Sequence, residues 1–299
     1  MKLERRKAHN PKVPWDIEEE RKLLKYLKKY EFDSKKLQDL FPNRGLPSIR
    51  NKARKLKIKH DIFGNSYRGD KELFTERIAF KTNPKIVFDA YAGAGHQTFI
   101  WSDKADQVFS AELMKSKIEQ FRKEAKRHGF KQVKKRYNWY RFKKGEKEIF
   151  YYIGDTIGAA ADLRANGIKA DLVDLDTCGS TLPTLAYFLL MLNPKNLVIT
   201  HGEFHSMRFQ REDVLRRLFL HRDINSNPLP ISVENMSQEL DKAVKVAALR
   251  AHNETTKSYW PELIEETWLG DKFHGMLRRH YEISKPMATA DCLNLLEKI

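Results

Sequence analysis

Val87-Phe88-Asp89-Ala90-Tyr91-Ala92-Gly93-Ala94-Gly95 is the stretch that decides the fold of this chain. Its apolar beginning predicts a buried strand, which ends at an acidic residue and runs into a glycine turn. Two further apolar segments, at 107–111 and 171–175, are followed by Glu112 and Asp176. Strands that end in acids and glycines are typical of an open α/β sheet, which binds its ligand across the C-terminal ends of the strands.

Strand-like and helix-like segments alternate through residues 85–299, and this order predicts an α/β fold. We expect parallel strands at 85–88, 107–111, 150–153, 171–175 and 196–200, with helices between them. A final antiparallel pair at 263–269 and 276–284 would complete the sheet. The prediction is a seven-stranded Rossmann-like sheet with helices on both faces.

The chain has 299 residues and a formal net charge of +16, so we expect a polyanionic partner such as nucleic acid. An ordinary basic surface is the alternative. Cys178 and Cys292 are the only cysteines, which argues against a zinc knuckle or a disulfide framework and for a reducing, cytoplasmic setting. No metal is expected. We also expect no signal peptide and no membrane partner, because no apolar run is long enough to span a bilayer. The oligomeric state is left open.

Residues 1–66 form a basic N-terminal unit. Residues 1–70 contain 20 Lys and Arg against 10 Asp and Glu, which is a net of +10. Asp16 is placed to cap a first helix, a second short helix is expected at 34–41, and a third basic helix at 47–56 follows the turn at 42–45. Residues 67–84 read as a linker.

Three short helices with an N-terminal Trp15 and a basic third helix resemble the Myb/SANT-like helix-turn-helix. The matching residues are Trp15, Glu18, Glu19, Leu23, Leu27, Phe41, Arg44, Ile49, Arg50 and Leu56. In that family the third helix enters the DNA major groove. The resemblance therefore implies nucleic-acid contacts from Arg44, Arg50, Arg54, Lys55 and Lys57. A helical module for protein contacts is the alternative.

A second basic segment, residues 131–148, interleaves cations with aromatic side chains. This mixture suits phosphate binding together with base stacking, and Lys135, Arg136, Trp139 and Arg141 are its candidate contacts. The alternative is an amphipathic hairpin whose aromatic residues pack on the sheet.

The order of acids and glycines resembles the class I S-adenosylmethionine-dependent methyltransferases. That resemblance implies a bound S-adenosylmethionine, with S-adenosylhomocysteine as product. Asp89 would face the methionine amino group, Glu112 the ribose hydroxyls and Asp155 the adenine amino group. A dehydrogenase is disfavoured because the G-x-G-x-x-G spacing is absent. The candidate cofactor residues are Asp89, Tyr91, Gly93, Gly95, Glu112, Asp155 and Asp174.

The acceptor site is expected after the strand at 171–175, in Asp174-Leu-Asp-Thr-Cys-Gly-Ser180. This loop resembles the Asp-Leu-Asp-Pro-Tyr/Phe-Gly-Ser loop of tRNA guanine-N2 methyltransferases, with Thr177 in place of the proline and Cys178 in place of the aromatic residue. In amino-methylating enzymes such a loop accepts hydrogen bonds from the exocyclic amine of a flipped-out base. The candidate catalytic residues are Asp176, Thr177, Cys178 and Gly179.

Four functions follow from these patterns. The favoured prediction, from the helix-turn-helix resemblance, is a methyltransferase that modifies an exocyclic amino group of adenine or cytosine in duplex DNA, and the other three are alternatives. The acceptor loop favours instead a tRNA or other RNA guanine-N2 methyltransferase. Cys178 leaves open a cytosine-C5 methyltransferase, since its thiolate could attack C6 of the base. The substituted loop also leaves open a DNA-binding regulator without catalytic activity.

Overall fold

The computed structural model describes residues 15–29, 34–45, 48–49, 52–53, 66–177, 179–203, 233–251, 257–269, 276–283 and 287–296. The chain divides into two compact units, residues 1–66 and residues 67–299. Within the described ranges, no helix is both long enough and apolar enough to cross a membrane.

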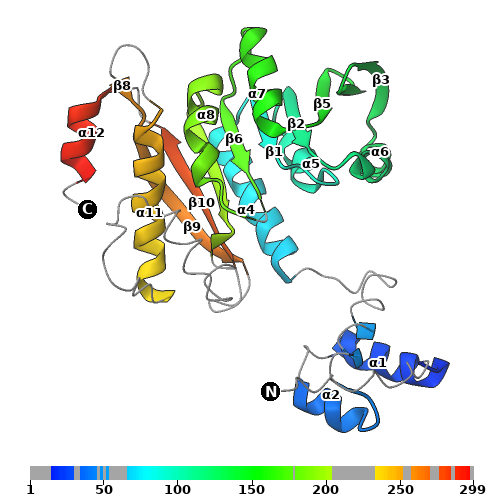
Figure 1. Ribbon diagram of the computed structural model, residues 1–299. Helices are drawn as coiled ribbons and strands as arrows, with labels where there is room; N and C mark the ends of the chain where they lie inside the picture. The colour runs from blue at the N-terminus through cyan, green and yellow to red at the C-terminus, as the bar shows by residue number, and fades with distance from the viewer. Residues whose placement is uncertain are drawn as a thin grey trace, which may run out of the picture. The chain divides into compact units, whose positions relative to one another are not determined.

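The larger unit is built on one mixed sheet, whose strand order is β3-β4-β5-β2-β1-β6-β7-β10-β9 (Figure 1). Parallel pairing joins β5, β2, β1, β6 and β7, whereas β10 runs antiparallel between β7 and β9. The strands are β1 Ile86–Ala90, β2 Gln107–Glu112, β3 Lys131–Arg136, β4 Trp139–Lys144, β5 Lys147–Ile153, β6 Leu172–Leu175, β7 Asn196–His201, β9 Pro261–Leu269 and β10 Met276–Ile283. The predicted parallel strands and the final antiparallel pair are therefore confirmed.

The described sheet has nine strands, so the prediction of seven is wrong in number. The two additional strands are β3 and β4, which form an antiparallel hairpin on the outer side of β5. They come from the basic segment 131–148, whose alternating aromatic residues bury one side of β4. A separate two-stranded ribbon pairs β8 (Lys257–Ser258) with β11 (Met287–Ala288).

Helices cover both faces of the sheet, as predicted. One face packs against α7 (Thr156–Ala165), α8 (Leu182–Leu192) and α11 (Val233–Leu249). The other packs against α4 (Ser66–Thr82), α5 (His96–Ser102) and α6 (Ile118–Arg127), which follows the short 3-10 turn η1 (Lys115–Lys117). A C-terminal helix, α12, spans Thr289–Leu296. Because each strand of the central sheet lies between two apolar layers, any charged side chain on it needs a partner.

The segment 67–84, predicted as a linker, is instead occupied mostly by α4. Phe74 and Ile78 of this helix are fully buried in the core of the larger unit. These apolar residues lie four positions apart, so they share one face of the helix. As a result α4 contributes side chains to the unit that carries the predicted cofactor site.

The smaller unit contains α1 (Ile17–Lys29), α2 (Ser34–Leu40) and helical residues at 48–49 and 52–53. Asp16 caps α1 as predicted, because its Oδ1 accepts from the Glu19 backbone N–H at 2.7 Å. Glu19 reciprocates through Oε2, which accepts from the Asp16 N–H at 3.2 Å, so the two form a capping box. The buried core consists of Leu23, Leu37, Phe41, Ile49 and Ala53.

Candidate functional site

The candidate site lies where the direction of strand addition reverses. Strand β1 pairs with β2 on one side and with β6 on the other, both in parallel. Ligands of open α/β sheets bind in the crevice beyond the C-terminal ends of the strands at such a switch point. The acids and glycines predicted from the sequence lie on these three strands or follow them, except Asp155, which follows β5.

The turn after β1 has a backbone that favours glycine. Gly93 and Gly95 have φ angles of 57° and 89°, in the left-handed region. A Cβ on Gly95 would lie 2.5 Å from the Phe121 ring, so a side chain there would clash with the core. A Cβ on Gly93 would have nothing within 4 Å, so Gly93 borders open space. The turn therefore presents bare backbone to a ligand, and Tyr91 (φ 68°) lies at its start.

Asp89 lies at the C-terminal end of β1 and is only 1% exposed. Its Oδ2 accepts a 2.5 Å hydrogen bond from Thr98, whereas its buried Oδ1 has no hydrogen-bond partner among the described residues. Burial raises the pKa of Asp89 well above its usual value, and the negative charge of Asp174 adds to the increase. A buried carboxylate oxygen without a donor is suited to receive a cationic group of a ligand.

Glu112 ends β2 beside the glycine turn. Its Oε2 accepts from the Gly93 N–H at 3.0 Å and its Oε1 from the Met114 N–H at 2.7 Å. These bonds fix the carboxylate at the rim of the crevice. Asp155 follows β5 and caps α7, where its Oδ2 accepts from the Gly158 N–H at 3.1 Å. Asp155 therefore has a structural role as the cap of α7, and its side chain is also exposed to solvent.

Asp174 differs from its predicted role, because it is engaged inside the protein. It is fully buried, and its Oδ2 accepts from Trp101 Nε1 at 2.8 Å and from Arg278 Nη2 at 2.7 Å. The register of the sheet places Asp174 directly beside Asp89. Arg278, on β10, is also fully buried and donates to Thr200 and Thr75. Asp174 thus forms a buried ion pair behind the cofactor crevice.

Asp176, the main catalytic candidate, forms an ion pair with Lys71 of α4. The Lys71 Nζ lies 2.8 Å from both carboxylate oxygens, and the two side chains are 16% and 18% exposed. Burial by itself would raise the pKa of Asp176, but the positive charges of Lys71 and Arg278 outweigh it and lower the pKa. Asp176 is therefore held as a carboxylate at the C-terminal end of β6.

The rest of the predicted acceptor loop is described only in part. Thr177 is half-buried, and its Oγ1 accepts from the exposed Gly179 N–H at 3.2 Å. Cys178 lies outside the described residues. After β7, His201 and Glu203 are buried beside each other, with His201 Nδ1 3.4 Å from a Glu203 oxygen. Burial lowers the pKa of His201. Among the residues that the structure describes, no group of three His, Cys, Asp or Glu could hold a metal ion.

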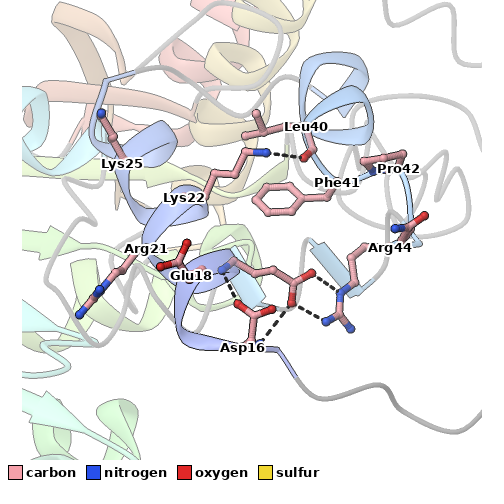
Figure 2. Close-up of a pocket in the computed structure, with 11 residues that line it drawn as sticks. Asp16, Glu18, Arg21, Lys22, Lys25, Leu40, Phe41, Pro42 and Arg44 are labelled. Atoms are coloured by element: carbon pink, nitrogen blue, oxygen red, sulfur yellow. Dashed lines mark hydrogen bonds and ion pairs between the residues drawn. The ribbon is translucent and has the colours of Figure 1, made fainter.

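In the N-terminal unit, Arg44 is directed into its own domain. Arg44 lines a pocket between α1 and the turn after α2 (Figure 2), and its guanidinium bonds to Glu19. Arg44 Nε donates to Glu19 Oε1 at 2.9 Å, and the guanidinium lies 4.9 Å from the Trp15 ring centroid. Only 9% of the Arg44 side chain is exposed, which favours a structural role over the predicted phosphate contact. The other candidates of this unit, Arg50, Arg54, Lys55 and Lys57, are not described.

The candidate contacts in the hairpin have different environments. Lys135 and Arg136 lie on β3, whose six residues are all exposed. Trp139 on β4 is half-buried, and its Nε1 lies 3.3 Å from Asp162 Oδ2. Arg141 pairs with Glu148, which is 9% exposed. The hairpin therefore has one side packed on the core and another side available to a ligand.

Two residues that the sequence did not single out, Lys71 and Arg278, hold the two acids of β6 and its loop. Lys71 lies in the segment assigned to a linker, where the apolar pair Phe74 and Ile78, four positions apart, is the signal that could have indicated the helix α4. Arg278 lies in a strand predicted correctly, between β7 and β9. A cation in a strand covered on both faces must be paired with an acid, and this signal could have indicated an ion pair with the central strands.

Comparisons with known proteins identify the fold. No family model matches the chain, and no curated protein matches it by sequence. Trm1 from Pyrococcus horikoshii, solved with S-adenosyl-L-methionine, is 18% identical and superposes with a TM-score of 0.60 over 77% of this chain. The N-methyltransferase NodS from Bradyrhizobium japonicum WM9 gives 10% identity and a TM-score of 0.46, over 74% of this chain and 99% of NodS. The M. jannaschii tRNA m1G37 methyltransferase gives 13% identity and a TM-score of 0.38, over 71% of this chain and 48% of that protein.

The superposition on Trm1 covers 57% of Trm1, so this chain corresponds to little more than half of that protein. At this level of identity the likeness establishes the fold. The chain has the α/β fold of the S-adenosylmethionine-dependent methyltransferases. The resemblance read from the sequence is confirmed to this extent.

Proposed function

We propose that this protein is an S-adenosylmethionine-dependent methyltransferase that modifies an exocyclic amino group of a base in RNA, with a guanine of tRNA as the favoured target. The observation that carries the proposal is the Asp176 carboxylate, which Lys71 holds just beyond the end of β6, the strand that pairs with β1 and so lies next to its glycine turn. This arrangement combines a cofactor crevice with a fixed hydrogen-bond acceptor.

The crevice fits the cofactor. Asp89 Oδ1 is buried without a described donor, which suits the ammonium group of the methionine moiety. Gly93 borders open space, and Glu112 lies beside it with oxygens that can also accept from ribose hydroxyls. When bound, S-adenosylmethionine supplies an electrophilic methyl group on its sulfonium. The side chains of Asp89 and Glu112 would orient the cofactor, and neither would exchange a proton in the transfer.

Asp176 would act on the acceptor by positioning. Its carboxylate accepts a hydrogen bond from the amino group of the base, which directs the nitrogen lone pair toward the methyl group. A base inside a helix cannot reach such a crevice, so the target nucleotide must be unpaired or flipped out. Lys71 keeps Asp176 in the charged form that accepts hydrogen bonds only.

RNA is favoured over DNA by the loop Asp174-Leu-Asp-Thr-Cys-Gly-Ser180, which resembles the tRNA guanine-N2 enzymes, and by the TM-score of 0.60 with Trm1. Duplex DNA remains the alternative, motivated by the resemblance of residues 1–66 to a helix-turn-helix. The inward-facing Arg44 weakens this alternative, because it removes one of the expected phosphate contacts.

The test is transfer of a labelled methyl group from S-adenosylmethionine to unmodified tRNA transcripts and, in parallel, to unmodified duplex DNA. We expect label in tRNA, with the modified base identified as N2-methylguanine after nuclease digestion. Label in DNA alone would contradict the RNA proposal. Absence of label in both substrates would contradict the enzymatic function.

Two variants separate the cofactor site from the acceptor site. Glu112→Ala should weaken cofactor binding by roughly tenfold to a hundredfold, since hydrogen bonds to charged groups contribute about 1.5–3 kcal/mol. Asp176→Ala should leave cofactor binding unchanged and remove methyl transfer. Glu146→Ala, an exposed change in the turn between β4 and β5, is the matched control. Full activity of Asp176→Ala would contradict the acceptor assignment.

A further inference from the structure

The β3–β4 hairpin forms one end of the sheet, where α6 packs against one of its faces. Strand β3 forms the outer edge of the sheet (Figure 1), and all six of its residues are exposed. A cavity of about 440 Å³ lies between this hairpin and the C-terminal half of α7. Its lining includes Lys134, Arg136, Tyr137, Trp139, Phe150 and Asp162. None of these residues takes part in the cofactor crevice or the acceptor loop.

The cavity has an aromatic wall that leaves ring surface open. Tyr137, at the tip of the hairpin, is 82% exposed and has a φ angle of 52°, which is unfavourable for a residue with a side chain. Trp139 lies next to it, half-buried, with its ring 4.8 Å from that of Tyr152. Phe150 stacks on Phe109 at 4.7 Å deeper in the cavity. Exposed aromatic rings on a supported strand are the usual platform for stacking nucleic-acid bases.

The charge of the hairpin complements a phosphate backbone. Residues 131–148 contain eight Lys and Arg against two Glu, a net of +6. Glu146 lies in the turn between β4 and β5. Glu148 lies on β5 and already pairs with Arg141 and Lys143. Lys134 and Arg136 make no ion pair with any residue in the described part of the chain. Their charges are therefore available to phosphates next to a stacked base.

One acidic side chain, Asp162 of α7, lines the same cavity. Its Oδ2 lies 3.3 Å from Trp139 Nε1, which fixes the carboxylate beside the aromatic wall. A carboxylate can only accept hydrogen bonds, so it selects a base edge that presents donors. Guanine presents two adjacent N–H groups on one edge, whereas adenine and cytosine present a single amino group.

From these observations we propose that the cavity binds one unpaired nucleotide of the RNA substrate, with guanine preferred, at a site separate from the cofactor crevice. The base stacks on Tyr137 and Trp139, its donor edge faces Asp162, and Lys134 and Arg136 hold the flanking phosphates. This inference rests on the proposed function for the choice of RNA. It adds a second contact that would help to select the RNA to be modified.

The test measures binding of a fluorescently labelled single-stranded RNA to the full chain without cofactor. Tyr137→Ala should weaken binding by roughly tenfold, because stacking contributes about 1–3 kcal/mol per base. Tyr137→Phe should bind as the unchanged protein does, since it keeps the ring. Asp162→Asn should remove the preference for an oligonucleotide with guanine over one with adenine at the same position. Equal binding by Tyr137→Ala and the unchanged protein would overturn the proposal.

The charged residues are tested by the salt dependence of binding. Lys134→Ala with Arg136→Ala should lower the slope of log affinity against log salt by about 1.4, which is the loss of two phosphate contacts on a single strand. Lys123→Ala with Lys126→Ala, two exposed changes on α6, is the control with the same loss of charge and should leave the slope unchanged. An equal decrease of the salt slope in the two double variants would indicate a general effect of charge and would overturn the proposed phosphate contacts.

This experiment is independent of methyl transfer. If Tyr137→Ala loses RNA binding but no RNA is ever methylated, the nucleotide site stands and the proposed function fails. If tRNA is methylated and Tyr137→Ala binds and reacts normally, the function stands and the nucleotide site fails. Displacement of the RNA by duplex DNA as efficiently as by unlabelled RNA would contradict the choice of an unpaired RNA nucleotide.

Discussion

Lys71 and Asp176 are 105 positions apart in the sequence, yet the Lys71 Nζ lies 2.8 Å from both oxygens of the Asp176 carboxylate. Lys71 lies on α4, which packs into the core of the larger unit through Phe74 and Ile78. The Thr75 hydroxyl, one turn further along, lies 3.0 Å from Arg278 Nη2, and Arg278 in turn holds Asp174. The helix α4 therefore contacts Asp176 directly through Lys71, and it reaches Asp174 only through Arg278.

Removal of Lys71 should affect turnover more than cofactor binding. In Lys71→Met, the burial of Asp176 is no longer outweighed by a nearby lysine, so its pKa rises. Because the carboxylate is ionised only above its pKa, the acid limb of the rate profile should move to higher pH. We also expect a loss of roughly tenfold to a hundredfold in kcat at neutral pH, since the acceptor would be positioned less accurately.

The control for this change is Lys81→Met, on the same helix, where the lysine is 52% exposed and lies 3.9 Å from Glu265. It should change neither the pH profile nor kcat. The measurements are methyl-transfer rates between pH 5 and 9 and calorimetric titration with S-adenosylmethionine. An unchanged acid limb in Lys71→Met would show that Asp176 does not depend on Lys71 for its charge.

The buried pair Asp174–Arg278 should be important for stability. Arg278→Met leaves the Asp174 carboxylate buried without its cation, which is expected to lower the free energy of unfolding by about 3–5 kcal/mol. Adding Asp174→Asn should restore much of this loss, because the neutral amide can still accept from Trp101. Urea denaturation of the larger unit measures both. A double variant as unstable as Arg278→Met alone would contradict the ion-pair explanation.

The positions of the central strands along the chain could be predicted from the sequence, because apolar runs that end in Asp89, Glu112 and Asp176 indicate parallel strands whose C-terminal ends form a ligand site. For the segment 131–148 it predicted a hairpin only as one of two alternatives, since the exposed cations on β3 hide the alternation of apolar and polar residues that is typical of a strand. The partners of the acids could not be predicted either. Lys71 and Arg278 are brought to the site by tertiary packing. A local sequence pattern does not show which acid pairs with a cation that is distant in the sequence.

The raised pKa of Asp89 predicts that cofactor binding depends on pH. Burial and the neighbouring Asp174 favour the protonated form of Asp89 in the free protein. A bound ammonium group favours the carboxylate, so binding should release a proton and the affinity should increase with pH. This holds below pH 7, where an α-amino group keeps its charge. Calorimetric titrations in buffers of different ionisation enthalpy would detect the released proton.

The comparison for this prediction is Asp89→Asn, which cannot titrate. It should bind S-adenosylmethionine roughly tenfold to a hundredfold more weakly, and its affinity should vary little with pH below 7. Proton release of the same size in Asp89→Asn and in the unchanged protein would assign the titration to another group and would remove Asp89 from the ammonium site.

We predict two different roles for the cations of the N-terminal unit, a structural role for Arg44 and nucleic-acid binding for Arg50, Arg54 and Lys57. Arg44→Ala removes the partner that, through its hydrogen bond, lowers the pKa of Glu19, and it opens the contact with Trp15. We therefore expect faster amide hydrogen exchange in α1 with little change in the salt dependence of tRNA binding. The triple change Arg50→Ala, Arg54→Ala and Lys57→Ala should instead lower the salt slope by about two, if these residues each contact a phosphate. Unchanged affinity in the triple variant would favour nucleic-acid binding by the β3–β4 hairpin, because the cations of β3 are exposed.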